Sequence, residues 1–446
     1  MSKNAATFGA DTPVAPHLSP EESVAVRKAA GASFIGNFVE WFDYASYGYL
    51  ATTIAVVFFP TVDPVAGLLS SFAVFAVSFI LRPIGAVFWG NWGDKYGRRW
   101  ALSWSILVMS ASTFLIAFLP GHTAIGIAAP LLLLLLRMVQ GFSASGEYAG
   151  AAAFMSEYAP PGKRGLYTSI VPASTAAGLL FGSLFVFVLH ALLSDAQLES
   201  WGWRIPFLLA APLGWVGRYI RVHLEDSPVY LQLARRAEAG PAATPVREVL
   251  RKYFGRVMVG LGVTCLNAVA FYLVLSYLPT YLSAEIGMDD DLALLSSTIS
   301  LAVYIGLIFL MGHISDTVGR KRMLVTACVL FIVLGVPAFW ALDSGHFVVA
   351  LAVQILLCAI LTMNDGTLAT FLSEIFPTRV RYTGFALSFN TANALFGGTA
   401  PLIVTWLIAT TGSTLAPGWY LAVVAGLALG AMLTIHETAF KPLPED

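Results

Sequence analysis

Two acidic side chains, Glu40 and Asp43, lie three residues apart in an otherwise apolar stretch of the chain. On a helix this spacing places them one turn apart, on neighbouring faces. Two carboxyl groups so close together do not readily ionise at the same time, so the pKa of one of them tends to rise. A group that takes up and releases protons needs such a raised pKa. The alternative is that arginines keep both acids ionised as links between helices. We predict that the pair binds protons.

Three more charged residues lie in apolar stretches: Arg82, Arg137 and Glu147. The Arg82 guanidinium could bind a substrate carboxylate through two parallel hydrogen bonds, or it could neutralise one of the two acids. Arg137 and Glu147 are ten residues apart, close to three helical turns, so they share roughly one face of a helix. Ionisable groups inside a membrane are costly and are usually functional or paired. We predict that Arg82 contacts the substrate.

Aromatic rings accompany these charges, notably Trp41 and Tyr44 beside the acids and Tyr272 in the second half of the chain. The face of such a ring attracts cations and can hold a quaternary ammonium group. Packing or a place at the membrane interface is the alternative role. We predict that these rings contact the substrate. The polar residues predicted to contact it from later apolar stretches are Asp365, Asn390 and Asn393.

A short charged segment occurs twice, each time between two apolar stretches. The first copy reads GNWGDKYGRR (90–99), and the second, GHISDTVGRKR (312–322), begins 222 residues later. Another pair, SEYAPPGKRG (156–165) and SEIFPTRVRYTG (373–384), repeats at a similar offset. Repeats at half the chain length indicate two related halves, as in transporters that rock around a central site.

The composition places most of the chain in a membrane. Charged residues make up 11% of the chain and the mean hydropathy is +0.76, whereas soluble domains carry about 25% charged residues. Continuous apolar runs of roughly 20 residues predict helices, because the strands of a membrane barrel would alternate. The predicted fold is all-α. The twelve predicted spans are 32–59, 67–92, 101–120, 125–157, 165–193, 203–223, 256–283, 292–314, 323–342, 346–376, 383–410 and 418–436.

Lysine and arginine predict the orientation of these spans. One set of connections holds nearly all of the basic residues, and the opposite set holds only Arg204. Basic connections stay in the cytoplasm, so both termini and the central connection are expected there. The predicted organisation is an N-terminal tail (1–31), a six-helix bundle (32–223), a central loop (224–255), a second six-helix bundle (256–436) and a C-terminal tail (437–446).

Several motifs together resemble a known family. The two GxxxDxxGR[KR] segments are similar to the signature loops of the major facilitator superfamily, and RMVQGFSASGEY (137–148) is similar to its fourth-helix motif. GNFVEWFDY (36–44), FILRPIG (79–85) and WGWRIPF (201–207) resemble its metabolite:proton symporter family, which includes bacterial proline/betaine, α-ketoglutarate, citrate and shikimate permeases. The second loop departs from the pattern, because Thr317 stands where a basic residue is expected. The resemblance implies a major facilitator fold of two six-helix bundles around a central cavity.

The resemblance also implies roles for single residues. It gives Arg137 a part in proton coupling, with an anchor to backbone carbonyls as the alternative, and the predicted coupling set is completed by Glu40, Asp43 and Glu147. The charged loops resemble a cytoplasmic gate that locks the two halves together when the outside is open. The predicted gate residues are Asp94, Arg98, Arg99, Glu157, Asp316, Arg320 and Glu374.

The function that the resemblance implies is proton-coupled uptake of a small polar metabolite across a bacterial inner membrane. A zwitterion such as proline or glycine betaine would suit a guanidinium beside aromatic rings. A dicarboxylate such as α-ketoglutarate, or a tricarboxylate such as citrate, would need a second cation, for which Arg137 or Arg204 is available. A solute sensor without transport is the alternative of another class. We expect a monomer in the lipid bilayer that is not an enzyme, has no cofactor or metal site, and binds no nucleic acid.

Overall fold

The computed structural model describes residues 19–60, 64–223, 225–227, 229–232 and 245–444. All regular secondary structure in these ranges is helical. Helices that fold in lipid satisfy their own backbone hydrogen bonds, which explains why long apolar runs of this chain form helices. The predicted all-α fold is confirmed.

Twelve membrane spans can be followed through the helices, and six of them consist of more than one helical segment. The N half consists of α1 (Pro20–Tyr49) with α2 (Ala51–Phe58), α3 (Pro64–Ile80) with α4 (Arg82–Tyr96), α5 (Arg98–Ile116), α7 (Ala128–Ala144) with α8 (Glu147–Tyr158), α9 (Arg164–Thr168) with α10 (Ile170–Leu192), and α12 (Arg204–Val222). The C half consists of α15 (Phe254–Phe271) with η2 (Tyr272–Tyr277) and α16 (Leu278–Ala284), α17 (Asp290–Val318), α18 (Arg320–Leu342), α19 (Phe347–Glu374), η3 (Thr378–Val380) with α20 (Arg381–Ala392), η4 (Asn393–Gly397) and α21 (Ala400–Thr411), and α22 (Ala416–Leu433). Short helices α6 (His122–Ile125), α11 (Asp195–Gln197), η1 (Leu198–Gly202) and α14 (Pro245–Lys252) lie in the connections.

Nine of these spans are long and apolar enough to cross a membrane on those grounds alone, among the described residues. The other three are α1, α3 with α4, and α12. Helix α1 carries four charged residues after its first turn, α12 carries three arginines, and the second span is interrupted at Leu81. Two of the four charges of α1, Glu40 and Asp43, are those of the predicted site.

The first span differs from its predicted bounds. Helix α1 begins at Pro20, twelve residues before the predicted start, and ends at Tyr49, where α2 continues after Leu50. Residues 20–31 are polar enough to resemble a tail. They are helical because Ala29 and Ala32 are buried in a cluster with residues of α5 and α8.

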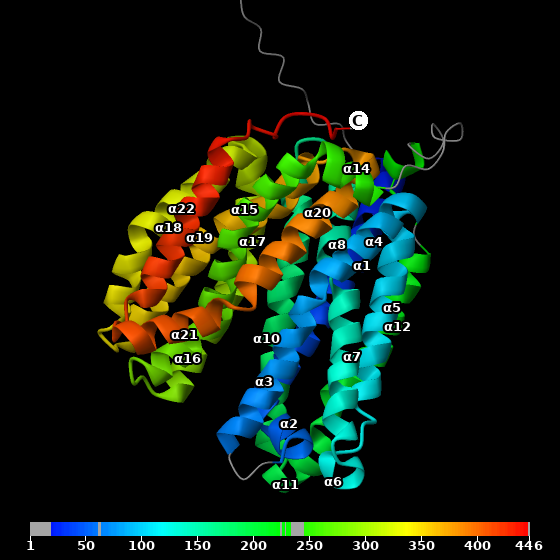
Figure 1. Ribbon diagram of the computed structural model, residues 1–446. Coiled ribbons are helices and arrows are strands. Elements are labelled where there is room, and N and C mark those ends of the chain that lie inside the picture. Colours follow the sequence, from blue (N-terminus) through cyan, green and yellow to red (C-terminus); the bar gives the residue numbers. More distant parts are fainter. Residues whose placement is uncertain (1–18, 61–63, 224, 228, 233–244, 445–446) are drawn as a thin grey trace, which may run out of the picture.

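The two halves meet at one end of the molecule and diverge toward the other (Figure 1). We call the end that carries Arg98 and Arg320 the basic end. Across the halves, α4 packs against α20, α9 against α17, and α8 against both α19 and α20. At the opposite end, α2, α6 and α11 of the N half lie apart from α16 and α21 of the C half (Figure 1). The molecule is therefore closed at the basic end.

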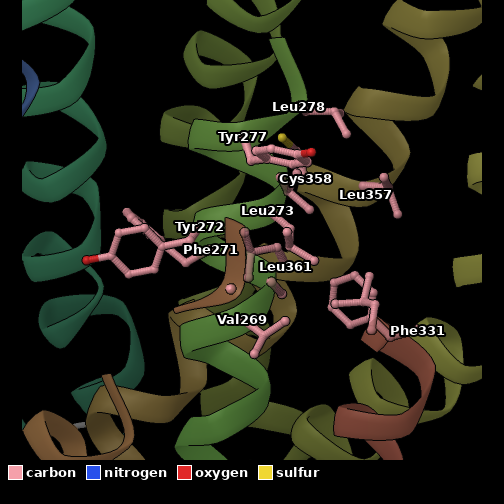
Figure 2. Packing of buried hydrophobic residues seen from close by; sticks show 14 of the residues in the cluster. Val269, Phe271, Tyr272, Leu273, Tyr277, Leu278, Phe331, Leu357, Cys358 and Leu361 are labelled. Atoms are coloured by element: carbon pink, nitrogen blue, oxygen red, sulfur yellow. The ribbon is translucent and has the colours of Figure 1, made fainter. Parts of the chain in front are cut away.

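Residues of α15 and η2 divide between the core of the C half and the boundary with the N half. Leu273 and Leu361 pack with Phe331 inside the C half, whereas Phe271 and Tyr272 point toward the blue-green ribbon of the N half (Figure 2). The change of direction coincides with the π-helical turn η2. Such turns insert an extra residue into a helix and are frequent at functional sites.

Candidate functional site

Arg82 lies where the second span is broken. Helix α3 ends at Ile80, and α4 begins at Arg82 with Pro83 in its first turn, where a missing backbone N–H costs no helical hydrogen bond. The Arg82 side chain is buried, and its Nη2 donates to Oε1 of Glu40 on α1 at 2.7 Å. In this structure the guanidinium therefore neutralises an acid of the first span, which was one of its two predicted roles.

Aromatic rings of the N half flank this ion pair. The Cζ atom of Arg82 lies 5.1 Å from the ring centre of Tyr44 and 4.7 Å from that of Phe79. The two rings are 5.7 Å apart. Cations within about 6 Å of an aromatic face are attracted to it, so these rings favour positive charge at this place.

Trp41 extends the aromatic group to the C half. Its ring centre lies 5.7 Å from Tyr44, 5.1 Å from Phe271 and 6.3 Å from Tyr272. Tyr272 is also 5.9 Å from Phe79. We call Trp41, Tyr44, Phe79, Phe271 and Tyr272 the aromatic cluster. The cluster joins the two halves beside the Arg82–Glu40 pair.

Several polar atoms of this region are buried without a hydrogen-bond partner in the part of the chain that the structure describes. They are Nε of Arg82, Oε2 of Glu40, Nε1 of Trp41 and the Tyr272 hydroxyl. Buried polar groups are normally satisfied, and an unsatisfied one points to an absent ligand or water. A donor, an acceptor and a cation-attracting surface thus remain available at the boundary between the halves.

Asp43 forms a second, separate ion pair. Nη1 of Arg137 on α7 donates to Oδ2 of Asp43 at 2.8 Å, and Gln140 donates to the same oxygen. Gln140 also donates to Thr113 at 2.7 Å. The guanidinium lies 3.7 Å from the ring centre of Tyr47. Asp43 and Glu40 are therefore each neutralised by their own arginine in this state.

Glu147 lies outside both of these groups. It pairs with Arg221 of α12 and accepts a hydrogen bond from Ser105 at 3.2 Å. Arg221 also donates to the backbone oxygens of Ala32 and Leu102. The structure thus joins α1, α5, α8 and α12 through this pair, and it separates Glu147 from Arg137, with which it shares a span.

The three polar C-half residues predicted to contact the substrate are each buried in a different setting. Asp365 accepts hydrogen bonds from Asn267 and Tyr304. Asn390 donates to the Ser145 carbonyl across the halves at 2.8 Å, where the break between α7 and α8 frees a backbone oxygen. Asn393 donates to Phe389 one turn earlier at 3.0 Å.

The first charged loop connects the halves at the basic end. Arg98 pairs with Asp94 and with Glu157, both at 3.0 Å, and donates to the Thr378 carbonyl of the C half. Glu157 also forms an ion pair with Arg381 of the C half, at 2.6 Å. Arg99, in contrast, is exposed, and its backbone amide donates to Asp226.

Asp94 also caps a helix of the other half. Its carboxylate accepts the backbone N–H groups of Tyr382 at 3.2 Å and Thr383 at 2.8 Å, in the first turn of α20. The first N–H groups of a helix have no partner within it, and the helix dipole favours a negative charge there. Asp94 therefore stabilises contact between the halves as well as its own loop.

The second charged loop makes the same contact in reverse. Asp316 of α17 accepts the backbone N–H groups of Gly165 at 2.8 Å and Leu166 at 3.0 Å, in the first turn of α9 in the N half. Arg320 pairs with Asp316 at 2.8 Å and with Glu374 at 3.4 Å. The sequence duplication is thus matched by two reciprocal helix caps across the halves.

The glycines of the two loops permit this approach. A Cβ atom at Gly90 would lie 2.6 Å from Cα of Thr383, and one at Gly312 would lie 2.6 Å from the carbonyl oxygen of Gly165. Neither neighbour can move away without a backbone shift. This explains why each loop has a glycine four residues before its aspartate.

The C-terminal strap, residues 434–444, crosses the basic end. Glu437 accepts the backbone N–H groups of Arg320 at 2.8 Å and Lys321 at 3.1 Å, at the start of α18. The Pro444 carbonyl accepts from the Thr378 N–H at 3.0 Å. Arg164 of the N half donates to the Lys441 carbonyl at 2.8 Å. This strap had no recognisable signal in the sequence.

Sequence reasoning also missed the partners of the charged groups, namely Gln140, Thr113, Arg221, Asn267, Tyr304 and Arg381. Arg221 lies at the basic end of a predicted span and Arg381 in a basic connection, so charge alone could have found them. The others are polar residues of apolar helices. Their partners lie on other helices, and residue spacing along one helix does not predict such contacts. Among the described residues, no group of three or more His, Cys, Asp or Glu could hold a metal ion.

Comparisons with known proteins agree with this architecture. The family model described as Major Facilitator Superfamily matches residues 33–401. The chain is 37% identical to the proline/betaine transporter of Escherichia coli (strain K12) over 94% of this chain and 85% of that protein. It is 38% identical to the glycine betaine/proline/ectoine/pipecolic acid transporter OusA of Dickeya dadantii (strain 3937), with the same coverage.

A solved structure shares the fold. The proton:xylose symporter XylE bound to 6-bromo-6-deoxy-D-glucose superposes with a TM-score of 0.79 over 95% of this chain and 98% of that chain, at 19% identity. The relatives are named as transporters, in agreement with the prediction that the chain is not an enzyme. The matched family, the two related halves and the shared fold lead to one conclusion: this chain is a membrane protein of the major facilitator superfamily.

Proposed function

We propose that the chain takes up a small zwitterionic solute, such as proline or glycine betaine, together with protons and by alternating access. The observation that carries this proposal is the Arg82–Glu40 pair beside the aromatic cluster. A zwitterion needs one group that binds a carboxylate and one that holds a cationic nitrogen. Both are present at the boundary of the two halves, and relatives named for proline and betaine support the choice.

The solute carboxylate binds the guanidinium of Arg82, whose Nε has no partner among the described residues. Its cationic nitrogen lies against Trp41 and Tyr272, and the unpaired oxygen of Glu40 adds negative charge. The rings come from both halves. A solute bound here therefore contacts both halves and is released when they rock apart.

Protons are coupled through Asp43 and Arg137. Protonation of Asp43 breaks its ion pair and frees the guanidinium to reorient, whereas deprotonation restores the pair. A buried ion pair that loses one charge leaves the other uncompensated, so the two states differ by several kcal/mol, roughly 3–5 in measured cases. Gln140 and Thr113 hold the carboxylate in place for this exchange.

The two charged loops, with Glu157 and Glu374, act as the gate at the basic end. The contacts in this structure close that end, and the reciprocal caps of Asp94 and Asp316 must separate when it opens. The lysine and arginine distribution supports placing the basic end, and with it both termini, in the cytoplasm of a bacterium. Opening this gate then releases the solute into the cell. We propose that one chain, a monomer in the lipid bilayer, suffices.

The dicarboxylate alternative lacks a second cation at this place. Arg137 is committed to Asp43. Arg204 lies at the opposite end, where it donates to the backbone oxygens of Ser200 and Leu119. Asn390 and Asn393 stay predicted substrate contacts from the C half.

The test is uptake of labelled solutes by purified transporter in vesicles with an imposed inward proton gradient. Glycine betaine and proline should accumulate, a protonophore should abolish accumulation, and α-ketoglutarate and citrate should not accumulate. Accumulation that continues with a protonophore and depends on sodium would contradict proton coupling. Accumulation of α-ketoglutarate but not of glycine betaine would contradict the solute class.

A further inference from the structure

Asp365 differs from the other buried acids of the described chain. Each of the others forms an ion pair with an arginine: Glu40, Asp43, Asp94, Glu147, Glu157, Asp316 and Glu374. Asp365 lies in the middle of α19, is 2% exposed, and makes no ion pair in the described part of the chain. Its two oxygens contact only neutral groups, the Asn267 amide and the Tyr304 hydroxyl.

The charged groups of the surrounding helices do not reach it. Arg164 of α9 and Arg320 of α18 pair with Glu374, and Arg256 of α15 donates to the carbonyl of the next residue, Ile375. Glu374 is nine residues further along α19, which is about 13 Å. The basic groups of these helices are thus gathered at the basic end, away from Asp365.

The remaining titratable groups near Asp365 are neutral or already paired. Tyr304 of α17 bonds to it, and Tyr148 of α8 lies close enough for an electrostatic interaction. Glu147, beside Tyr148, belongs to Arg221. The cysteines that line these helices are Cys265 of α15, Cys328 of α18 and Cys358 of α19. None of these groups supplies a positive charge.

An ionised carboxylate without a counter-ion is strongly disfavoured in such a place, and the group takes up a proton instead. The surroundings suit both forms of the acid. A hydroxyl can donate or accept, and an amide presents either its nitrogen or its oxygen, so Tyr304 and Asn267 can receive the proton of a carboxylic acid as well as donate to a carboxylate. A hard metal cation would require several oxygen ligands, which this cage does not offer.

Asp365 is also displaced from the solute site. Its partner Asn267 precedes Tyr272 of the aromatic cluster by five residues of the same span, which is about 7 Å along the helix. Tyr148 lies between the halves, stacked on Phe389 at 4.2 Å, and its hydroxyl has no partner among the described residues. This hydroxyl of the N half interacts electrostatically with Asp365.

We propose that Asp365 is a second proton-binding site, in the C half, and that it is protonated when the basic end is closed. The carrier then has one proton site in each half: Asp43 held by an arginine, and Asp365 held by neutral groups. This role replaces the substrate contact predicted for Asp365 from the sequence. It does not depend on which solute is carried.

Infrared spectroscopy of the purified protein in lipid, without any solute, tests this directly. A protonated carboxyl group has a carbonyl stretch that is separate from the bands of a carboxylate. The parent should show this stretch at neutral pH and lose it on titration to high pH. Asp365→Asn should lack it, and Asp43→Asn, the matched control, should retain it because Asp43 is ionised in the parent.

Asp365→Glu guards against misfolding of the asparagine variant. It keeps a carboxyl group in the same cage, so the stretch should persist at a changed frequency. The proposal would be overturned if the parent lacked the stretch at neutral pH. It would also be overturned if the stretch persisted in Asp365→Asn, or if its frequency did not change in Asp365→Glu. None of these results depends on uptake of glycine betaine or proline, so failure here is distinct from failure of the proposed function.

Discussion

At the scale of single residues, the ion pairs distinguish the acids that lie within the membrane spans of the N half. Glu40, Asp43 and Glu147 looked alike in the sequence, as acids within apolar stretches. In the structure their arginines come from three different helices, α4, α7 and α12. Each of the three acids thus has its own surroundings, and our proposal assigns Glu40 to the solute, Asp43 to coupling and Glu147 to a link between helices.

Arg82 should bind the solute through the geometry of its guanidinium and not through charge alone. Arg82→Lys should weaken binding of glycine betaine at least tenfold, about 1.4 kcal/mol, because an ammonium group offers no two-bond fork to a carboxylate. Titration calorimetry measures this. Arg204→Lys, at the opposite end, is the control and should bind like the parent. Normal affinity in Arg82→Lys would show that Arg82 is structural.

Asp43 should be needed for coupling and not for exchange. Asp43→Asn should abolish accumulation driven by a proton gradient while it retains exchange of internal for external glycine betaine, because exchange does not require the empty carrier to release its proton. Glu147→Gln, the control, should lower thermal stability instead, since it leaves Arg221 buried without its charge partner. If Asp43→Asn accumulates solute like the parent, coupling lies elsewhere.

At the scale of helices, the sequence predicted the spans and the duplicated loops but not how the spans are broken. Apolar runs and repeated motifs are local, so they could be recognised without a structure. The breaks at Leu81 and at Ser145 place Arg82 at a helix start and expose the carbonyl that Asn390 binds. The partners of Asp43 lie 94 and 97 residues away, and no spacing rule identifies contacts of that kind.

The glycines of the charged loops should control closure of the basic end. Gly90→Ala places a Cβ against Cα of Thr383, so the cap of Asp94 on α20 should loosen. Hydrogen–deuterium exchange at the amides of Tyr382 and Thr383 should become faster, and transport slower, while glycine betaine affinity stays within about tenfold of the parent.

Gly306→Ala is the matched control on α17, because a Cβ there would meet no atom within 4 Å. It should leave exchange at both amides unchanged. If exchange at these amides were as fast in Gly306→Ala as in Gly90→Ala, the Gly90 contact would not be what holds the end closed. The same would follow if exchange in Gly90→Ala were as slow as in the parent.

At the scale of the whole molecule, the two halves are alike in their charged loops and unlike in their interior. Each loop caps a helix of the opposite half through its aspartate, Asp94 or Asp316. The interior arginines Arg82 and Arg137 both belong to the N half, whereas the C half contributes Phe271, Tyr272 and an acid without an arginine. The sequence indicated this uneven distribution of charge. Rocking of two unlike interiors around one boundary site fits a carrier that moves a solute and protons together.

Proton movement caused by the solute tests this account most directly. Vesicles that contain the purified transporter, with no proton gradient imposed, receive external glycine betaine while a pH-sensitive dye reports the outer solution. Symport predicts that the outer solution becomes alkaline as glycine betaine enters, and that Asp43→Asn shows entry without this change. Entry of glycine betaine into vesicles of the parent without alkalinisation, or entry that requires sodium, would contradict proton-coupled uptake.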